Sequence, residues 1–224
     1  MLISTSERRL LQIQGVSGAV FFVFLIVHLG NVLMAPFGES VFNAYQQAAR
    51  TVYQHPAIEL PFVLSPIVVH AVAGVWLFVI RRANQNMSWR ARLHRYSAAF
   101  LLLVVGGHVV AVRGPSAFFD VWPEFEGISF SLWFFPAWFF PYYFLLAMAG
   151  FYHGANGLRM VLARGGWIPH AGIPAAWLAV AGVSFAICLA ALGGMFFSVP
   201  NPADSEFGRL YESVIGIQMD KPWR

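Results

Sequence analysis

The chain has 224 residues, of which 58% are hydrophobic and 11% are charged, and its mean hydropathy is +0.64. These values leave too little polar surface to cover a soluble globule of this size, so they exclude a soluble protein and indicate an integral membrane protein. The single cysteine, Cys188, excludes a disulfide framework, an iron–sulfur cluster held by thiolates and the attachment of a c-type haem.

Five apolar runs are each long enough for a helix to cross about 30 Å of hydrocarbon at about 1.5 Å per residue. We therefore predict an all-α bundle of five transmembrane helices that forms a single membrane domain, residues 1–224. The predicted helices comprise residues 12–34, 59–80, 95–113, 137–162 and 172–198. The first run is too long for a signal-peptide core and lacks a convincing cleavage site, so we expect it to remain in the protein.

Basic residues are concentrated in alternate connections between these helices. If the N-terminus is cytoplasmic, nine of the 14 basic residues fall on the inner side and only two fall in the outer loops. The positive-inside bias thus predicts a cytoplasmic N-terminus and an outside C-terminus, in a multi-pass protein of the bacterial cytoplasmic (inner) membrane. The net charge of +4 is explained by the basic residues that set the membrane topology. It therefore gives no reason to propose nucleic acid as a partner.

The two outer connections are not plain linkers. Residues 38–56 have apolar side chains at helical spacing, which predicts a short helix lying in the lipid interface. Residues 114–136 are rich in phenylalanine and tryptophan, which is typical of an aromatic belt. Both segments suit anchoring to membrane lipid, and an entrance for quinone is the alternative interpretation.

Four of the seven histidines lie inside predicted helices, one in each of the first four: His28, His70, His108 and His153. At about 1.5 Å per residue from the cytoplasmic ends, His70 and His153 both lie at a depth of ~15 Å, and His28 and His108 lie at roughly 20 to 24 Å. We call the first two the inner pair and the others the outer pair. The remaining histidines fall at helix ends or in loops, where solvation explains them: His55, His94 and His170.

The surrounding sequences repeat in the same way. Ser17-Gly18 and Ser97-Ala98 each precede a histidine of the outer pair by eleven residues, which is close to three turns and puts serine and histidine on one face. Each histidine of the inner pair is followed by glycine four residues later and by arginine eleven residues later. These residues are Gly74 and Arg81 in one helix, and Gly157 and Arg164 in the other.

These residue types suit a haem site. A glycine one turn from an imidazole leaves room for a flat macrocycle, and an arginine on the same face is within reach of a propionate, although an arginine that extends to the headgroups fits equally well. Two imidazoles at one depth, without a neighbouring cysteine or carboxylate, favour bis-histidine ligation of haem b over zinc, which usually takes a third protein ligand. We therefore predict two haem b groups, whose irons are bound by the inner and the outer pair.

The sequence resembles a known family in the following places: Ser17-Gly18, His28-Leu29 with Asn31, AYQQAARTVYQHP at 44–56, His70 with Gly74, Arg95-Tyr96-Ser97 ahead of His108, and His153 with Asn156-Gly157. It is similar to the membrane anchors of succinate:quinone oxidoreductases and fumarate reductases, in the class with one five-helix dihaem cytochrome b subunit. Ala98 stands where this family commonly has glycine. The resemblance covers the first four predicted helices, and the last one adds nothing to it.

This resemblance implies a function and partners. The subunit would pass electrons between an iron–sulfur subunit and a membrane quinone, either ubiquinone or menaquinone, in the respiratory chain. A flavoprotein subunit, also on the cytoplasmic face, would interconvert succinate and fumarate, so the chain itself would bind no dicarboxylate. The arginine-rich inner loop, residues 81–95, is then a candidate docking surface, although topology alone explains it equally well.

A quinone site requires a titratable or hydrogen-bonding group beside an apolar slot. Glu59 and His55 are the candidates on the outer side, which we prefer, and Arg95 and Tyr96 are the candidates on the inner side. An ordinary interfacial carboxylate is the alternative for Glu59.

Two other classes of protein have similar features. The haem b subunit of a respiratory nitrate reductase takes its ligands from two helices including the last, but the last predicted helix here has no histidine. A proton-coupled transporter uses intramembrane histidines as a relay, but usually adds intramembrane carboxylates, and the interiors of these helices have none.

Overall fold

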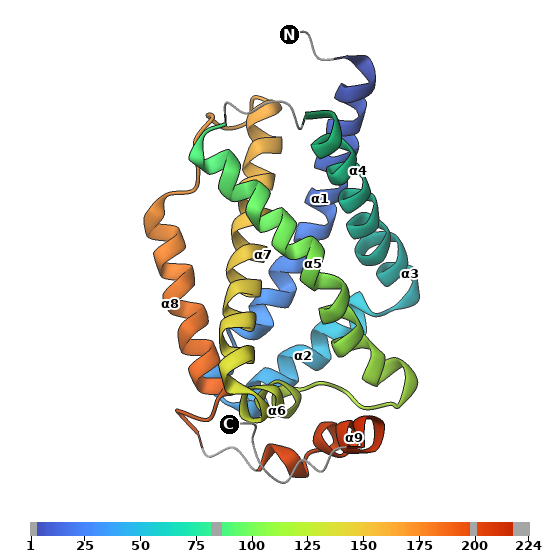
Figure 1. The fold of residues 1–224 in the computed structure, drawn as a ribbon, viewed down its shortest axis with the longest axis vertical. Helices are drawn as coiled ribbons and strands as arrows, with labels where there is room; N and C mark the ends of the chain where they lie inside the picture. The colour runs from blue at the N-terminus through green and yellow to red at the C-terminus, as the bar shows by residue number, and fades with distance from the viewer. Residues whose placement is uncertain (1–3, 82–86, 198–200, 217–224) are drawn as a thin grey trace. The chain divides into compact units, whose positions relative to one another are not determined.

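The computed structural model describes residues 4–81, 87–197 and 201–216. Regular structure within these ranges consists of helices and includes no strand (Figure 1). The prediction of an all-α membrane fold is therefore confirmed. The five longest helices are α1 (Thr5–Val32), α4 (Ser65–Arg81), α5 (Trp89–Phe118), α7 (Pro136–Arg164) and α8 (Ala175–Leu192).

Among the described residues, four helical stretches are long and apolar enough to cross a membrane: Thr5–Phe37, Pro56–Arg81, Trp89–Phe118 and Ala175–Leu192. They coincide with four of the five predicted transmembrane helices. The remaining predicted helix lies within α7, which has 29 residues but also contains prolines, tyrosines and an asparagine that lower its hydropathy. Five membrane-spanning helices, their orientation and the single domain stay predictions.

Shorter helices occupy the connections. The helix expected within residues 38–56 is present as α2 (Glu39–Tyr53). It is followed by α3 (Pro56–Ile58) and by a π-helix, η2 (Glu59–Leu64), that runs into α4. In the second outer connection, α6 (Phe125–Phe134) was not predicted. The other elements are η1 (Ala35–Phe37), η3 (Pro202–Asp204) and α9 (Glu206–Ile215).

The chain divides into two compact units, each of which is described by itself. The first unit comprises Met1–His28, Ala49–Leu102 and Ala149–Leu178. The second comprises Leu29–Ala48, Leu103–Met148 and Ala179–Arg224. The boundaries fall inside α1, α2, α5, α7 and α8, so each of these helices contributes residues to both units.

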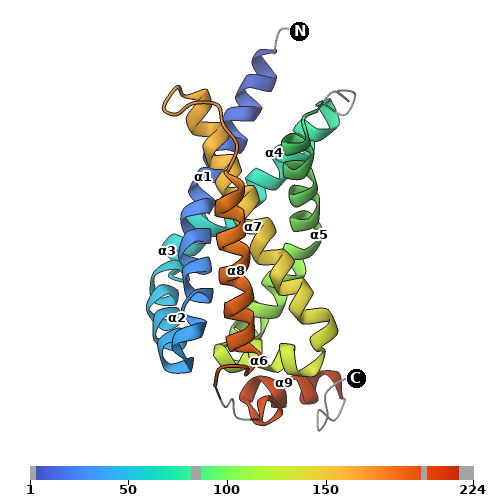
Figure 2. The same cartoon turned by 90° about the vertical axis from the view of Figure 1, so that its left-hand side faces the viewer.

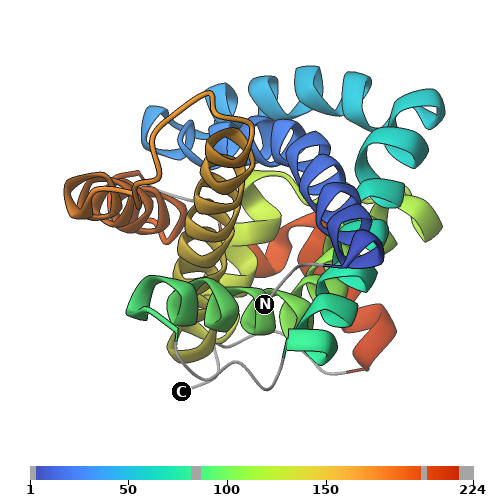
Figure 3. The same cartoon turned by 90° about the horizontal axis from the view of Figure 1, so that it is seen from above.

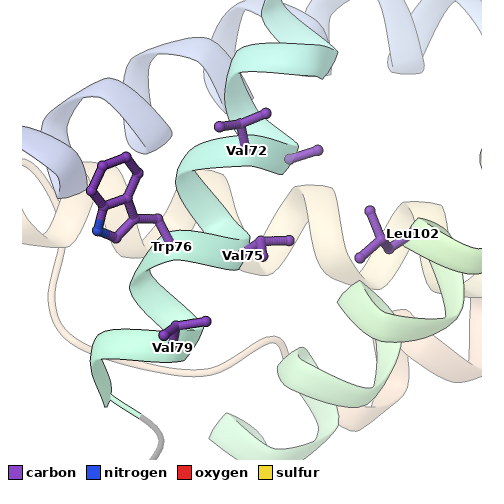
Figure 4. A pocket seen from close by; sticks show the side chains of 6 residues that line it. Val72, Val75, Trp76, Val79 and Leu102 are labelled. Carbon is purple, nitrogen blue, oxygen red and sulfur yellow. The ribbon is translucent and has the colours of Figure 1, made fainter.

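The first unit contains most of α1, all of α4 and parts of α5 and α7. Figure 3 shows α1 and α4 from above. One surface of this unit, formed by α4 and α5, is apolar. A groove of about 500 Å³ is lined entirely by apolar residues of α4 and α5, and Val75 of α4 points towards Leu102 of α5 there (Figure 4). Lipid chains can cover such a surface without leaving any polar group unsatisfied, as expected of a helix in hydrocarbon.

The second unit has a core of residues from α2, α6 and α8. The rings of Phe42 and Phe125 are fully buried and meet edge to face, with their centres 5.5 Å apart. Ser129 of α6 donates a hydrogen bond to the Leu192 carbonyl of α8 at 2.7 Å. α9 lies beside α6 (Figures 1 and 2), and its Phe207 packs against Phe130 of that helix in a second, smaller cluster, with ring centres 6.1 Å apart.

An acidic hollow of about 310 Å³ also lies in the second unit, between α2, α6 and α9. Burial, followed by the negative charges of Glu126 and Glu124, raises the pKa of Glu39, and the Asn43 amide partly opposes this rise. Asn43 also accepts a hydrogen bond from the Phe125 N–H at 2.9 Å. Because Glu124, the N-cap residue of α6, makes no side-chain cap, Asn43 supplies an acceptor that the start of this helix needs.

We expect Asn43→Ala to lower the free energy of unfolding by about 1–2 kcal/mol, because the Phe125 N–H would lose its partner in a buried position. Thermal unfolding in detergent measures the change. Asn201→Ala is the control, since Asn201 bonds only at an exposed position, to Asp204 and Ala203. Equal melting temperatures for the two variants would contradict this role of Asn43.

Candidate functional site

Three histidines form a cluster in the first unit. The ring centres of His70 (α4) and His153 (α7) lie 5.9 Å apart, with their planes at 83°. His94 (α5) stacks on His153, with ring centres 4.2 Å apart and planes at 8°. The structure thus brings the inner pair together and adds a histidine that was expected only at a helix end. The described residues contain no group of three or more histidine, cysteine or acidic side chains arranged to hold a metal ion.

The Nδ1 atoms of the inner pair are both hydrogen-bonded. His70 Nδ1 lies 2.9 Å from the Gln14 carbonyl, which can only accept, so His70 carries its proton on Nδ1. His153 Nδ1 lies 3.3 Å from the Ser97 hydroxyl, whose single proton is donated to the His94 carbonyl at 2.9 Å. Ser97 therefore accepts from His153. A neutral ring whose proton lies on Nδ1 keeps its lone pair on Nε2, which is then available to bind a metal.

Glycines let the helices approach this cluster closely. A Cβ atom on Gly18 would lie 2.6 Å from His70 Nδ1, so only glycine fits there. A Cβ atom on Gly74 would lie 3.1 Å from Gln14 Nε2, and one on Gly157 would lie 3.8 Å from His94 Cε1. The expected room for a macrocycle beside Gly74 and Gly157 stays a prediction.

Gly18 and Ser97 contact the inner pair in this structure, whereas Ser17 bonds within its own helix. The sequence spacing related them to the outer pair, because residues eleven apart share a helix face. The same eleven residues also separate them by about 16 Å along the axis, which prevents contact. Gly18 instead meets His70, and Ser97 meets His153. The Ser17 hydroxyl donates to the Ile13 carbonyl at 2.7 Å and is 3.2 Å from that of Gln14.

The outer pair is divided between the units. His28 belongs to the first unit, where its ring stacks on that of Phe24 with centres 5.6 Å apart. His108 lies on α5 in the second unit. Their pairing stays a prediction.

The two arginines expected near a propionate lie at the ends of α4 and α7. Arg81 Nε is 2.7 Å from the Glu7 carboxylate, in an ion pair that sequence reasoning did not identify. Arg164 lies near enough to Arg81 for their positive charges to interact. Contact of Arg81 and Arg164 with a propionate stays a prediction. In the proposed docking loop, residues 82–86 lie outside the described part of the chain.

The outer quinone candidates lie close together in sequence at the start of η2. His55 caps α3 by accepting the Ala57 N–H at 3.3 Å, and Glu59 is the first residue of the π-helix. Pro66 is a signal in the sequence from which this irregular turn could have been predicted, because proline has no N–H to donate to the preceding turn. π-Helical turns are frequently found at functional sites.

The inner quinone candidates are consecutive residues of α5. The Arg95 guanidinium lies 5.5 Å from the centre of the Phe78 ring, which is a cation–π contact between α5 and α4. Tyr96 is 67% exposed. Neither residue is joined to the histidine cluster by a described hydrogen bond.

The chain is thus an all-helical membrane protein in which histidines of two different helices lie together. A sequence model of the succinate dehydrogenase/fumarate reductase transmembrane subunit matches residues 77–191, more than half of the chain, so the chain belongs to this family. The match includes His94, His108 and His153, and it extends into α8, which the motifs did not cover. No curated protein and no solved structure matches the chain.

We expect Gly18→Ala to lower the free energy of unfolding by about 1–3 kcal/mol, because its methyl group would overlap the His70 ring. The change is measured by thermal unfolding in detergent. Gly114→Ala is the matched control in another helix, since a Cβ atom there would meet nothing within 4 Å. A Gly18→Ala variant as stable as Gly114→Ala would show that α1 does not approach His70 so closely.

Proposed function

We propose that the chain is a dihaem cytochrome b subunit that carries electrons between the iron–sulfur subunit of the complex and a membrane quinone. The observation that carries this proposal is the geometry of the inner pair, two imidazoles from different helices with both Nδ1 atoms hydrogen-bonded. The family membership supports the anchor role, because this family supplies the transmembrane subunit of succinate dehydrogenase or fumarate reductase.

The inner pair fits a haem iron. The two ring centres lie 5.9 Å apart and come from different helices, so one iron could be bound by both rings. His70 and His153 would be the axial ligands, and the bound haem would supply a one-electron carrier. A zinc ion fits less well, because no third protein ligand is present among the described residues.

The residues around the inner pair tune and protect it. The Gln14 carbonyl and the Ser97 hydroxyl each accept a hydrogen bond from an Nδ1–H group, which fixes the tautomer and makes Nε2 a more basic ligand. Gly18 keeps the α1 backbone against His70, and apolar helix faces exclude water from the site. Arg81 and Arg164 would neutralise propionates at the cytoplasmic end.

The outer pair, His28 and His108, would bind the second haem. This assignment rests on their similar depth in the predicted helices and on the family resemblance. A second haem nearer the outer surface would let electrons cross the membrane in two steps, between the soluble subunits and an outer quinone site.

The iron–sulfur and flavoprotein subunits would dock on the cytoplasmic face, where Arg90 and Arg92 lie near the start of α5. Neither arginine has a described carboxylate partner within the chain, and acidic groups on a soluble subunit would complement them. The Arg90 carbonyl accepts the Tyr152 hydroxyl at 3.2 Å, which connects this end of α5 to α7 and the inner pair.

The quinone would bind on the outer side, at Glu59 and His55. A carboxylate and an imidazole at the start of a π-helix offer the proton donor and acceptor that quinone chemistry requires. The adjoining α4 surface is apolar, as a quinone ring and its isoprenoid chain would need.

Substitution of single histidines tests the ligand pairs. We expect His70→Ala and His153→Ala each to disturb only the inner haem, and His28→Ala and His108→Ala only the outer haem, because each iron would lose one of its two ligands. The remaining ligand can retain a five-coordinate high-spin haem, so low-temperature electron paramagnetic resonance (EPR) is needed together with pigment content. If His28→Ala and His70→Ala altered the same haem signal, the pairing would be wrong.

Glu59→Gln tests the quinone site. We expect it to lower quinone-linked turnover at least tenfold while both haem signals persist, because a positioned proton-transfer group typically contributes about 10²–10⁴-fold. The control is Glu212→Gln, which makes the same change of a carboxylate to an amide in α9 of the second unit. Unchanged turnover in Glu59→Gln, with both haems present, would remove Glu59 from the site.

A further inference from the structure

His94 is the member of the histidine cluster to which the proposed ligand set gives no role. Its ring lies parallel to that of His153, with centres 4.2 Å apart. A ring stacked in this way covers one face of the His153 imidazole and leaves the nitrogen edge open. The contact therefore restricts rotation of His153 without competing for its Nε2 atom.

The ring of His94 is held in turn by Asn156. The Asn156 amide nitrogen lies 3.2 Å from His94 Nδ1, and because an amide nitrogen only donates, Nδ1 of His94 accepts and its ring proton lies on Nε2. Asn156 is 8% exposed and follows His153 by three residues on α7. The same helix thus supplies one histidine of the inner pair and the residue that fixes its stacking partner.

The main chain of His94 makes a second connection. Its carbonyl accepts the Ser97 hydroxyl at 2.9 Å, and this hydroxyl accepts from His153 Nδ1 at 3.3 Å. His94 therefore acts on His153 both through its ring and, by way of Ser97, through its carbonyl. Ser97 is buried, so water does not readily replace this connection.

Gln14 occupies the equivalent place on α1. It precedes Ser17 by three residues, as His94 precedes Ser97, and its carbonyl lies 3.2 Å from the Ser17 hydroxyl. The same carbonyl accepts directly from His70 Nδ1 at 2.9 Å.

The side chains of Gln14 and His94 also have equivalent neighbours. Gln14 lies over Gly74, and His94 lies over Gly157, the two glycines that follow the inner pair by four residues. Helices α1 and α4 thus repeat the arrangement of α5 and α7, which makes chance contact a poor explanation for the position of His94.

We propose that His94 is a positioning residue that fixes the plane of the His153 imidazole at the inner haem, as the Gln14 main chain does for His70. This inference rests on the proposed function, because it takes His153 as an axial ligand. The angle between ligand planes governs the EPR anisotropy of a low-spin haem, and the hydrogen bond at Nδ1 governs ligand basicity and hence the midpoint potential. A purely structural role would leave both quantities unchanged.

The test uses the purified complex with both haems bound. We expect Ser97→Ala to raise the midpoint potential of the inner haem and shift its low-field EPR feature, because His153 loses its acceptor and becomes a weaker donor to ferric iron. Ser97→Thr retains the hydroxyl and should restore both values. His94→Leu should shift the EPR feature, and His94→Phe, which keeps a flat ring for stacking, should shift it less.

Ser116→Ala is the matched control. Ser116 lies on the same helix, and its hydroxyl likewise donates to a carbonyl three residues earlier, that of Arg113 at 3.1 Å. This variant should leave the inner haem unchanged, and the outer haem signal reports correct folding in every variant. If Ser97→Ala loses the inner haem and Ser97→Thr retains it, the result supports the proposal. If both variants lose the haem, the EPR feature of His94→Leu compared with that of His94→Phe decides.

Two results would overturn the inference. An inner haem with unchanged EPR feature and potential in both Ser97→Ala and His94→Leu shows that His94 does not position His153. An unchanged low-spin inner signal in His153→Ala overturns the ligand assignment itself, and with it this inference. The His153→Ala variant therefore separates failure of the proposed function from failure of the positioning role.

Discussion

A polar side chain inside a bilayer has to find its hydrogen-bond partners within the protein, because hydrocarbon offers none. For an imidazole this constraint also decides its chemistry. One ring nitrogen of His70 is satisfied by a main-chain carbonyl and one of His153 by a serine hydroxyl, so the other nitrogen of each ring keeps its lone pair. The same bonds that make these histidines tolerable in the membrane would therefore also prepare them for the proposed binding of haem iron.

Serine makes this arrangement possible between helices. Its hydroxyl proton is donated to the carbonyl of the preceding turn, as Ser97 does to His94, and the oxygen then remains as an acceptor for a neighbouring helix. Ser17 makes the same kind of bond within α1, but there the carbonyl of Gln14 itself reaches His70. Small residues such as Gly18 bring the backbones near enough for either route.

Hydropathy and spacing predicted the long helices, α2 and the meeting of His70 with His153, because these depend on length and depth along a helix. They did not predict His94, since α5 begins at Trp89 rather than at residue 95, where the predicted helix begins, and the extra turns carry His94 into the cluster. Helical periodicity also predicts which residues share one face of a helix, but not which neighbouring helix contacts that face. For this reason Ser97 was related to a distant histidine of its own helix instead of to His153.

The two imidazoles of the inner pair differ in whether a substitution can remove the hydrogen-bond acceptor of Nδ1. The acceptor for His70 is a main-chain carbonyl, which no substitution of Gln14 removes as long as α1 remains helical. The acceptor for His153 is a side chain, and its stacking partner is another, so single substitutions can alter both. Basicity and ring plane of a ligand influence the potential of a bound haem. If the inner pair binds haem as proposed, substitutions on α5 would adjust its potential while α1 keeps the opposite ligand constant.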